Sequence, residues 1–176
     1  MGLDATTGRR SRRTLLIGVG AGAVVLAGVG IGLGFVLPRS GAAISPSVRQ
    51  ALEAALDDEY KARATYNAVI EKLGPVAPFN NVVRAEDGHV RSLVTLFEQY
   101  GLPVPPDRYA GKVQAPATLA AACALGVQAE LDNVAIYDRL LGTVQGKDEI
   151  VAVFQRLRAA SQDNHLPAFK GCAGGG

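Results

Sequence analysis

The sequence predicts an all-α protein, a four-helix bundle with one long crossover loop, preceded by an apolar N-terminal segment. From Ser45 onward apolar residues recur with a period close to 3.6, and no stretch alternates as a strand would. Apolar residues make up 48% of the 176 residues, which is enough for one packed core. Glycine and proline divide the helical region into four long segments, and the longest irregular stretch separates the second from the third.

The first 43 residues predict a signal for export. Polar residues precede an apolar run that ends at Leu37, and small residues follow at positions 40–43, the three-part pattern of a secretory signal. Residues 11–16 (SRRTLL), followed by a glycine-rich run, resemble a twin-arginine signal. Residues 14–37 are also long enough to cross a bilayer, so a cleaved signal peptide and an uncleaved membrane anchor are both open. We therefore expect an exported protein, either secreted or held in the cell envelope.

The charge distribution argues against nucleic-acid binding. The formal net charge of +2 comes from 18 basic and 16 acidic residues. Five of the basic residues and one acid lie in residues 1–43, which leaves 13 basic and 15 acidic residues for the rest of the chain. The predicted bundle therefore has a small negative charge and lacks the basic cluster that a phosphate backbone requires.

The first helical hairpin is predicted between residues 45 and 101. Ser45 followed by proline is a typical helix start, and the first helix covers residues 46–73 before Gly74 ends it. The second helix covers residues 80–100 and ends at Gly101.

The second hairpin follows a long connection. Residues 102–116 contain four prolines and predict an irregular crossing loop. Thr118 caps a third helix that ends before Gly142, and a fourth covers residues 148–171 with two acids in its first turn. Short links within each hairpin and one long link between them define the ferritin-like arrangement.

This topology sets the predicted boundaries of the chain. We assign residues 1–43 to the signal or anchor, residues 44–171 to the bundle and residues 172–176 to a flexible tail.

The two hairpins repeat one pattern. In each, a glutamate precedes a tyrosine by seven residues on the first helix, and a histidine follows on the second helix. The members are Glu59, Tyr66 and His89 in one hairpin and Glu130, Tyr137 and His165 in the other. Seven residues are two helical turns, so each Glu and Tyr share a helix face. The repeat predicts a duplicated helical hairpin.

Five ionisable residues interrupt the apolar stripes of the four helices: Glu59, Glu86, His89, Glu130 and His165. Antiparallel neighbours that lie equally far from their connecting turn sit at one height, which places these side chains in a shared layer. Unpaired buried charges are costly, and carboxylates with imidazoles are ligands of divalent cations. We therefore predict a metal site. The competing interpretation is structural, because a single buried histidine is more often a hydrogen-bonded core residue.

Four segments carry a family resemblance. They are DDEYKAR at 57–63, AEDGH at 85–89, GVQAE at 126–130 and NHLPAF at 164–169. In these segments, and over residues 47–171, the chain resembles the bacterial and archaeal ferritin-like group known as domain of unknown function 2202. The resemblance implies the ferritin-like fold and the same five residues as metal ligands, and it implies no established reaction. Glu86 and His89 are the Glu-x-x-His half of a di-iron carboxylate motif.

Residue 162 departs from the full two-fold di-iron pattern. Gln162 stands three residues before His165, where a second Glu-x-x-His would need a glutamate. The predicted site is therefore asymmetric, with three carboxylates, and Asp163 or a water is left to complete one metal position.

The two cysteines occupy related places. Cys123 lies seven residues before Glu130, and Cys172 lies seven residues after His165, so antiparallel helices bring both to one height. An exported protein meets an oxidising compartment. We predict a Cys123–Cys172 disulfide, with two buried free thiols as the alternative.

These observations predict an envelope protein that binds two irons and reacts with dioxygen or peroxide, manganese and zinc being other metals that suit the ligands. We expect Glu86 and Glu130 to bridge the ions, and Tyr66 and Tyr137 to be core residues too far away for direct contact. Iron oxidation, peroxide removal and metal sequestration are all open. The alternatives are a metal-free, membrane-tethered interaction module and a protein with one structural zinc or manganese. The oligomeric state is also open.

Overall fold

The computed structural model describes residues 43–174, which form an all-α bundle with no strand in that range. The helices are α1 (Pro46–Leu73), α2 (Phe79–Gln99), α3 (Leu119–Thr143) and α4 (Asp148–Ala160), followed by a π-helical segment η1 (Ser161–His165) and α5 (Leu166–Gly174). This confirms the predicted fold class, including the single long crossover. The predicted signal or anchor lies outside the described residues, apart from residue 43.

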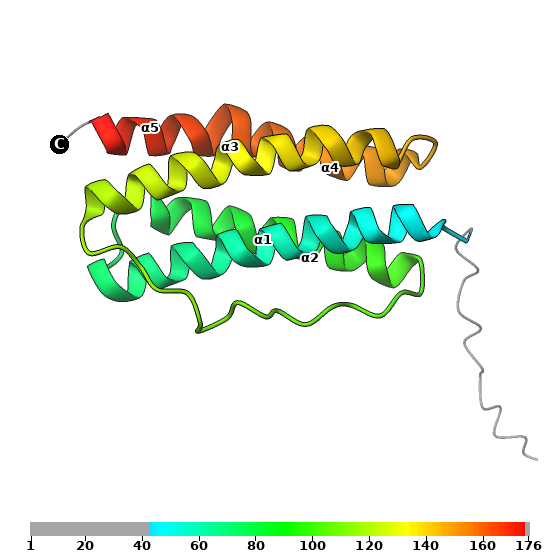
Figure 1. Cartoon of the computed structure of the whole chain (residues 1–176), viewed down its shortest axis with the longest axis horizontal. Coiled ribbons are helices and arrows are strands. Elements are labelled where there is room, and N and C mark those ends of the chain that lie inside the picture. Colours follow the sequence, from blue (N-terminus) through cyan, green and yellow to red (C-terminus); the bar gives the residue numbers. More distant parts are fainter. Residues whose placement is uncertain (1–42, 175–176) are drawn as a thin grey trace, which may run out of the picture. The chain divides into compact units, whose positions relative to one another are not determined.

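Every helix of the bundle is antiparallel to its neighbours. Around the bundle the order is α1, α2, α4, α3, and η1 and α5 continue α4 (Figure 1). The ends of the helices follow the sequence signals. Ser45 Oγ accepts the N–H of Val48 at 3.3 Å, and Thr118 Oγ1 accepts that of Ala121 at 3.2 Å. Gly74 ends α1 with a φ of 86°, a left-handed value that glycine adopts without strain.

Two predicted boundaries were wrong. Gly142 does not end the third helix, which continues to Thr143, and the turn depends instead on Gly146 with its φ of 79°. The predicted flexible tail does not begin at Cys172, because α5 continues to Gly174. Residues 175–176 lie outside the described range.

A disulfide joins this last helix to α3. Cys123 of α3 and Cys172 of α5 are joined, with their Cα atoms 5.7 Å apart, as the sequence predicted. The same two helices pack closely at Gly126, where an added Cβ would lie 2.5 Å from the ring of Phe169. The covalent link and the close packing together hold α5 against α3.

The crossover, residues 100–118, lies alongside α1 and is hydrogen-bonded to it. Arg63 Nη2 donates to Asp107 Oδ2 at 2.8 Å, and Lys72 Nζ donates to the carbonyl oxygen of Ala115 at 3.0 Å. The loop is therefore held to the first hairpin along its course (Figure 1).

The core consists of two apolar clusters, one toward each end of the bundle. One cluster includes Leu52, Leu56, Leu93, Phe97 and Phe154, and the other includes Tyr66, Phe79, Val82 and Phe169. Between them, at mid-length, the inward positions are polar. α3 is long and apolar enough to span a membrane, but it contributes polar residues to this layer and packs against α1, α4 and α5.

Candidate metal centre

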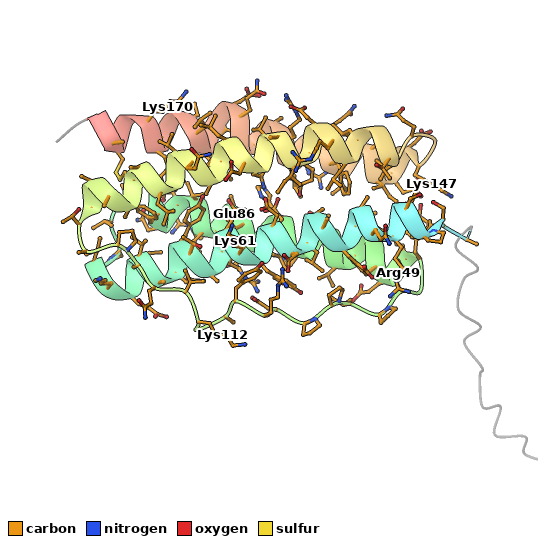
Figure 2. All side chains as sticks on the ribbon, viewed as in Figure 1. Arg49, Lys61, Glu86, Lys112, Lys147 and Lys170 are labelled. Carbon is orange, nitrogen blue, oxygen red and sulfur yellow. A yellow bond between two sulfur atoms is a disulfide. The ribbon has the colours of Figure 1, made fainter. Side chains whose placement is uncertain are left out.

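The five predicted site residues meet in the polar layer between the two apolar clusters. They are Glu59 of α1, Glu86 and His89 of α2, Glu130 of α3 and His165 of η1. The three glutamates are at most 2% exposed, and the side chains of His165 and His89 are 6% and 12% exposed. Figure 2 shows Glu86 near the middle of the bundle. Carboxylates this deeply buried need positive charge close by.

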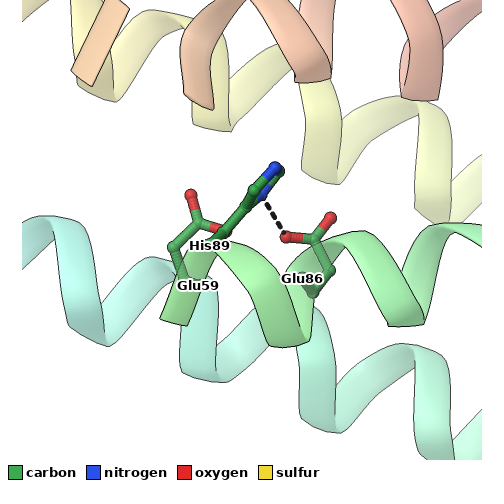
Figure 3. Close-up of side chains that lie close together, drawn as sticks. All are labelled: Glu59, Glu86 and His89. Carbon is green, nitrogen blue, oxygen red and sulfur yellow. Dashed lines mark hydrogen bonds and ion pairs between the residues drawn. The ribbon is translucent and has the colours of Figure 1, made fainter. Parts of the chain in front are cut away.

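The first group of ligand atoms surrounds His89. Its Nδ1 lies 3.2 Å from Glu59 Oε2 and 3.0 Å from Glu86 Oε2 (Figure 3). The three residues offer ligand atoms that all lie within 4.8 Å of one another. We call Glu59, Glu86 and His89 the first triad.

The second group surrounds His165. Its Nδ1 lies 3.1 Å from Glu86 Oε1 and 3.4 Å from Glu130 Oε2. These distances suit an ion pair, yet within residues 43–174 this buried nitrogen has no hydrogen bond of acceptable geometry. We call Glu86, Glu130 and His165 the second triad, and their ligand atoms are again within 4.8 Å of one another.

Glu86 is the carboxylate that the two triads share. It presents Oε2 to His89 and Oε1 to His165, whose rings are stacked with their centroids 5.5 Å apart. Glu130 offers a ligand atom to the second triad only, and the expectation that it bridges two ions together with Glu86 stays a prediction. Glu59 and Glu130 each belong to a single triad.

The two tyrosines contact the site directly, against expectation. Tyr66 donates its hydroxyl to Glu130 Oε1 at 2.5 Å, and Tyr137 donates to Glu59 Oε1 at 2.7 Å. Each tyrosine is two turns from the glutamate of its own helix, but α1 and α3 are antiparallel, so it reaches the glutamate of the other helix. Both hydroxyls hold Oε1 and leave Oε2 facing a histidine.

Asn133 and Asp58 also belong to the site, and the sequence reasoning missed both. Asn133 of α3 is 4% exposed, and its Nδ2 donates to Asp58 Oδ2 at 2.9 Å and to Glu59 Oε1 at 3.3 Å. A usable signal was present, because Asn133 lies three residues after Glu130 and therefore on the same helix face.

The π-helical segment η1 changes which residues share the buried helix face with His165. The N–H of Leu166 donates to the carbonyl of Ser161, five residues back, and this wider turn shifts the helix face. Ser161 is buried with His165, whereas Gln162 and Asp163 are exposed. Asp163 therefore does not complete the site, and the residue that takes the inward place beside His165 is a serine.

Burial and mutual contact shift the pKa values within the layer. Burial and the nearby charge of Glu86 raise the pKa of Glu59 to about 7. Burial acts to lower the pKa of each histidine, but the carboxylates outweigh it and raise the pKa of His89 to about 10 and that of His165 to about 9. Burial acts to raise the pKa of Glu86, and the contacts with His165 and His89 reverse this and lower it.

The donor set fits divalent cations. Without metal, protons on the two imidazoles neutralise most of the carboxylate charge. Cations can take the place of these protons, since each Nδ1 already points at two carboxylate oxygens. Carboxylate oxygens with imidazole nitrogens suit iron, manganese and zinc.

The fold and this layer define a class, an all-α bundle with a buried carboxylate–histidine cluster that can hold a metal ion. The chain is similar in structure to a hypothetical protein from Methanococcus jannaschii DSM 2661, with a TM-score of 0.67 and 21% identity over 79% of this chain and 85% of that one. A likeness at this identity shows a shared fold. No protein-family model and no curated protein matches the chain.

Proposed function

We propose that the bundle binds two divalent cations, iron by preference, one in each triad, with Glu86 shared between them. The observation that carries this proposal is the pair of triads around His89 and His165, which meet at the two oxygens of one carboxylate. A cluster with only a structural role would need neither a shared carboxylate nor a buried His165 Nδ1 without a hydrogen bond of acceptable geometry.

Two ferrous ions would supply two electrons, one each, enough to reduce hydrogen peroxide with two protons to two waters. The protein's own residues set the conditions for this chemistry. Tyr66 and Tyr137 donate hydrogen bonds to Oε1 of Glu130 and of Glu59, which holds the two carboxylates in place. The apolar clusters exclude water from both ends of the layer. Iron oxidation and peroxide removal are both outputs of such a site.

We also propose that the protein works outside the cytoplasm. Two observations support this, the three-part pattern of residues 1–43 and the Cys123–Cys172 disulfide, which is typical of oxidising compartments. The resemblance of the four segments to a ferritin-like group supports the same site and stays a prediction.

Metal stoichiometry tests the central claim. Metal-free full-length protein is titrated anaerobically with Fe(II), and bound iron is counted after desalting. We expect two irons per chain in the wild type and fewer than one in Glu86→Gln. Glu98→Gln is the matched control, because Glu98 is an exposed glutamate on the same helix, and it should keep both irons. Loaded protein is then given peroxide, and loss of chelatable Fe(II) measures the oxidation.

Other results would point to the alternatives. One tightly held zinc or manganese that excludes iron would indicate a single structural metal. No stoichiometric metal in the wild type would leave a metal-free helical module. Glu86→Gln with two irons per chain would contradict the shared-carboxylate site.

A further inference from the structure

A buried metal layer needs a route from the surface, and a pocket between α1 and α3 lies beside it. The pocket has a volume of about 90 Å³, and its lining includes Asp58, Ala62, Ala129 and Asp132. Asp58 and Ala129 directly precede Glu59 and Glu130 in the sequence, so the pocket lies at the same height along the bundle as the metal layer.

Oxygen atoms lead from this pocket to Glu59. Asp132 is an exposed residue of the pocket lining, Asp58 is half-buried in that lining, and Asn133 donates its amide N–H groups to both Asp58 and Glu59. The other end of that amide, Oδ1, is buried and has no hydrogen-bond partner within residues 43–174. Unpartnered carbonyl and carboxylate oxygens are ligands of hard divalent cations.

These oxygen-bearing side chains lie beside Glu59 and have no counterpart beside Glu130. The internal repeat pairs Asn133, four residues before Tyr137, with Ala62, four residues before Tyr66. It likewise pairs Asp58 with Ala129. The polar residues therefore accompany Glu59, and the equivalent positions beside Glu130 are alanines.

On the α2–α4 side of the bundle, a positive charge lies close to the metal layer. His89 is the most exposed site residue, and one turn along α2 Ser92 accepts a hydrogen bond from Arg156 Nη2 at 3.3 Å. A guanidinium there repels divalent cations. The α1–α3 pocket also has Lys61 in its lining, but two aspartates outnumber it.

On the basis of the proposed function, we propose that divalent cations reach the centre through the α1–α3 pocket, past Asp132, Asp58 and Asn133, and fill the first triad before the second. Attraction by Asp132 raises the association rate, and the unpartnered Asn133 carbonyl receives the ion next to Glu59.

Stopped-flow uptake of Co(II) by the metal-free full-length protein tests the route. Asp132→Lys should slow association about tenfold at low ionic strength, and the difference should shrink at high salt because the effect is electrostatic. The final stoichiometry should not change, since Asp132 is exposed and touches no ligand. Asp163→Lys, at an exposed position of η1, is the matched control and should leave the rate unchanged.

Two results would overturn the route. One is an Asp132→Lys rate equal to that of the wild type, and the other is faster uptake in Arg156→Gln, which would place access at the α2–α4 side. Failure of the wild type to bind Co(II) at all would instead refute the proposed function, so the two failures are distinguishable.

The filling order has its own measurement. The chain has two histidines, and His89→Gln assigns their ring signals in a proton NMR spectrum. One equivalent of paramagnetic Co(II) should shift the His89 signals first, and a first shift at His165 would contradict the order.

Discussion

At the scale of single residues, two hydrogen bonds between α1 and α3 position the site glutamates. Each tyrosine donates its hydroxyl to the glutamate of the other helix. Each hydroxyl donates to a carboxylate that is fully or almost fully buried. The sequence showed both tyrosines, but distance along one helix was the wrong measure. Because α1 and α3 are antiparallel, Tyr66 of α1 lies level with Glu130 of α3, and Tyr137 of α3 lies level with Glu59 of α1.

Tyr137→Phe should destabilise the metal-free protein. The change removes a buried donor and leaves Glu59 Oε1 with Asn133 alone. We expect the free energy of unfolding, from urea denaturation, to fall by about 1–3 kcal/mol. Tyr109→Phe is the control, because its hydroxyl meets Asp57 near the surface, and it should lose about 0.5 kcal/mol or less. Equal losses in the two variants would argue against a special role for the buried pair.

The histidines should make the metal-free bundle less stable as the pH rises. Their ordinary pKa of 6.5 is raised in the folded protein to about 10 for His89 and about 9 for His165. Between these values the folded state binds more protons than the unfolded state. The stabilisation is therefore full below pH 6.5 and is lost as the pH rises through 9 to 10.

Thermal unfolding between pH 6 and pH 10 measures this effect. The Tm of the metal-free protein should fall across the range. The increase in Tm on metal loading should grow instead, because cations bind deprotonated imidazoles. A metal-free Tm that rises toward pH 10 would contradict the pairing of the histidines with the carboxylates.

At the scale of elements, α3 and α5 pack closely where Gly126 meets the ring of Phe169. Gly126→Ala should destabilise the protein by about 1–3 kcal/mol, because the new methyl group would overlap the ring of Phe169. Gly142→Ala is a matched control on the same helix with nothing within 4 Å. It should be neutral or stabilising by up to about 1 kcal/mol, owing to the better helix propensity of alanine. Denaturation midpoints compare the two, and the same sign in both would refute the packing argument.

The disulfide also acts at this scale, since it anchors the helix that follows the π segment. Replacing Cys123 and Cys172 together by alanine should lower the free energy of unfolding by about 2–4 kcal/mol. His165 directly precedes α5, so the second triad should lose more metal affinity than the first. Calorimetric titration with Co(II) measures both affinities. Equal weakening of the two positions would show that the disulfide acts only on global stability.

At the scale of the whole molecule, the sequence predicted the fold and the five site residues for the same reason. Apolar periodicity defined the inward faces, and equal distances from the turns placed Glu59, Glu86 and the other three at one height. Periodicity could not predict the π segment, because a helical period of 3.6 treats Ser161 to His165 as a regular turn. Tertiary contacts decide where a helical turn widens. Asn133 was missed because neutral amides do not stand out from a stripe as charges do.

The position of the first triad has a consequence for biosynthesis. Glu59, Glu86 and His89 all belong to the hairpin of α1 and α2, whereas the second triad combines Glu86 with two residues from the later hairpin. Translation proceeds from the N-terminus, so a growing chain possesses one whole set of metal-binding groups before α3 has been synthesised. The later half of the chain then adds a second position to a site whose first ligands already exist.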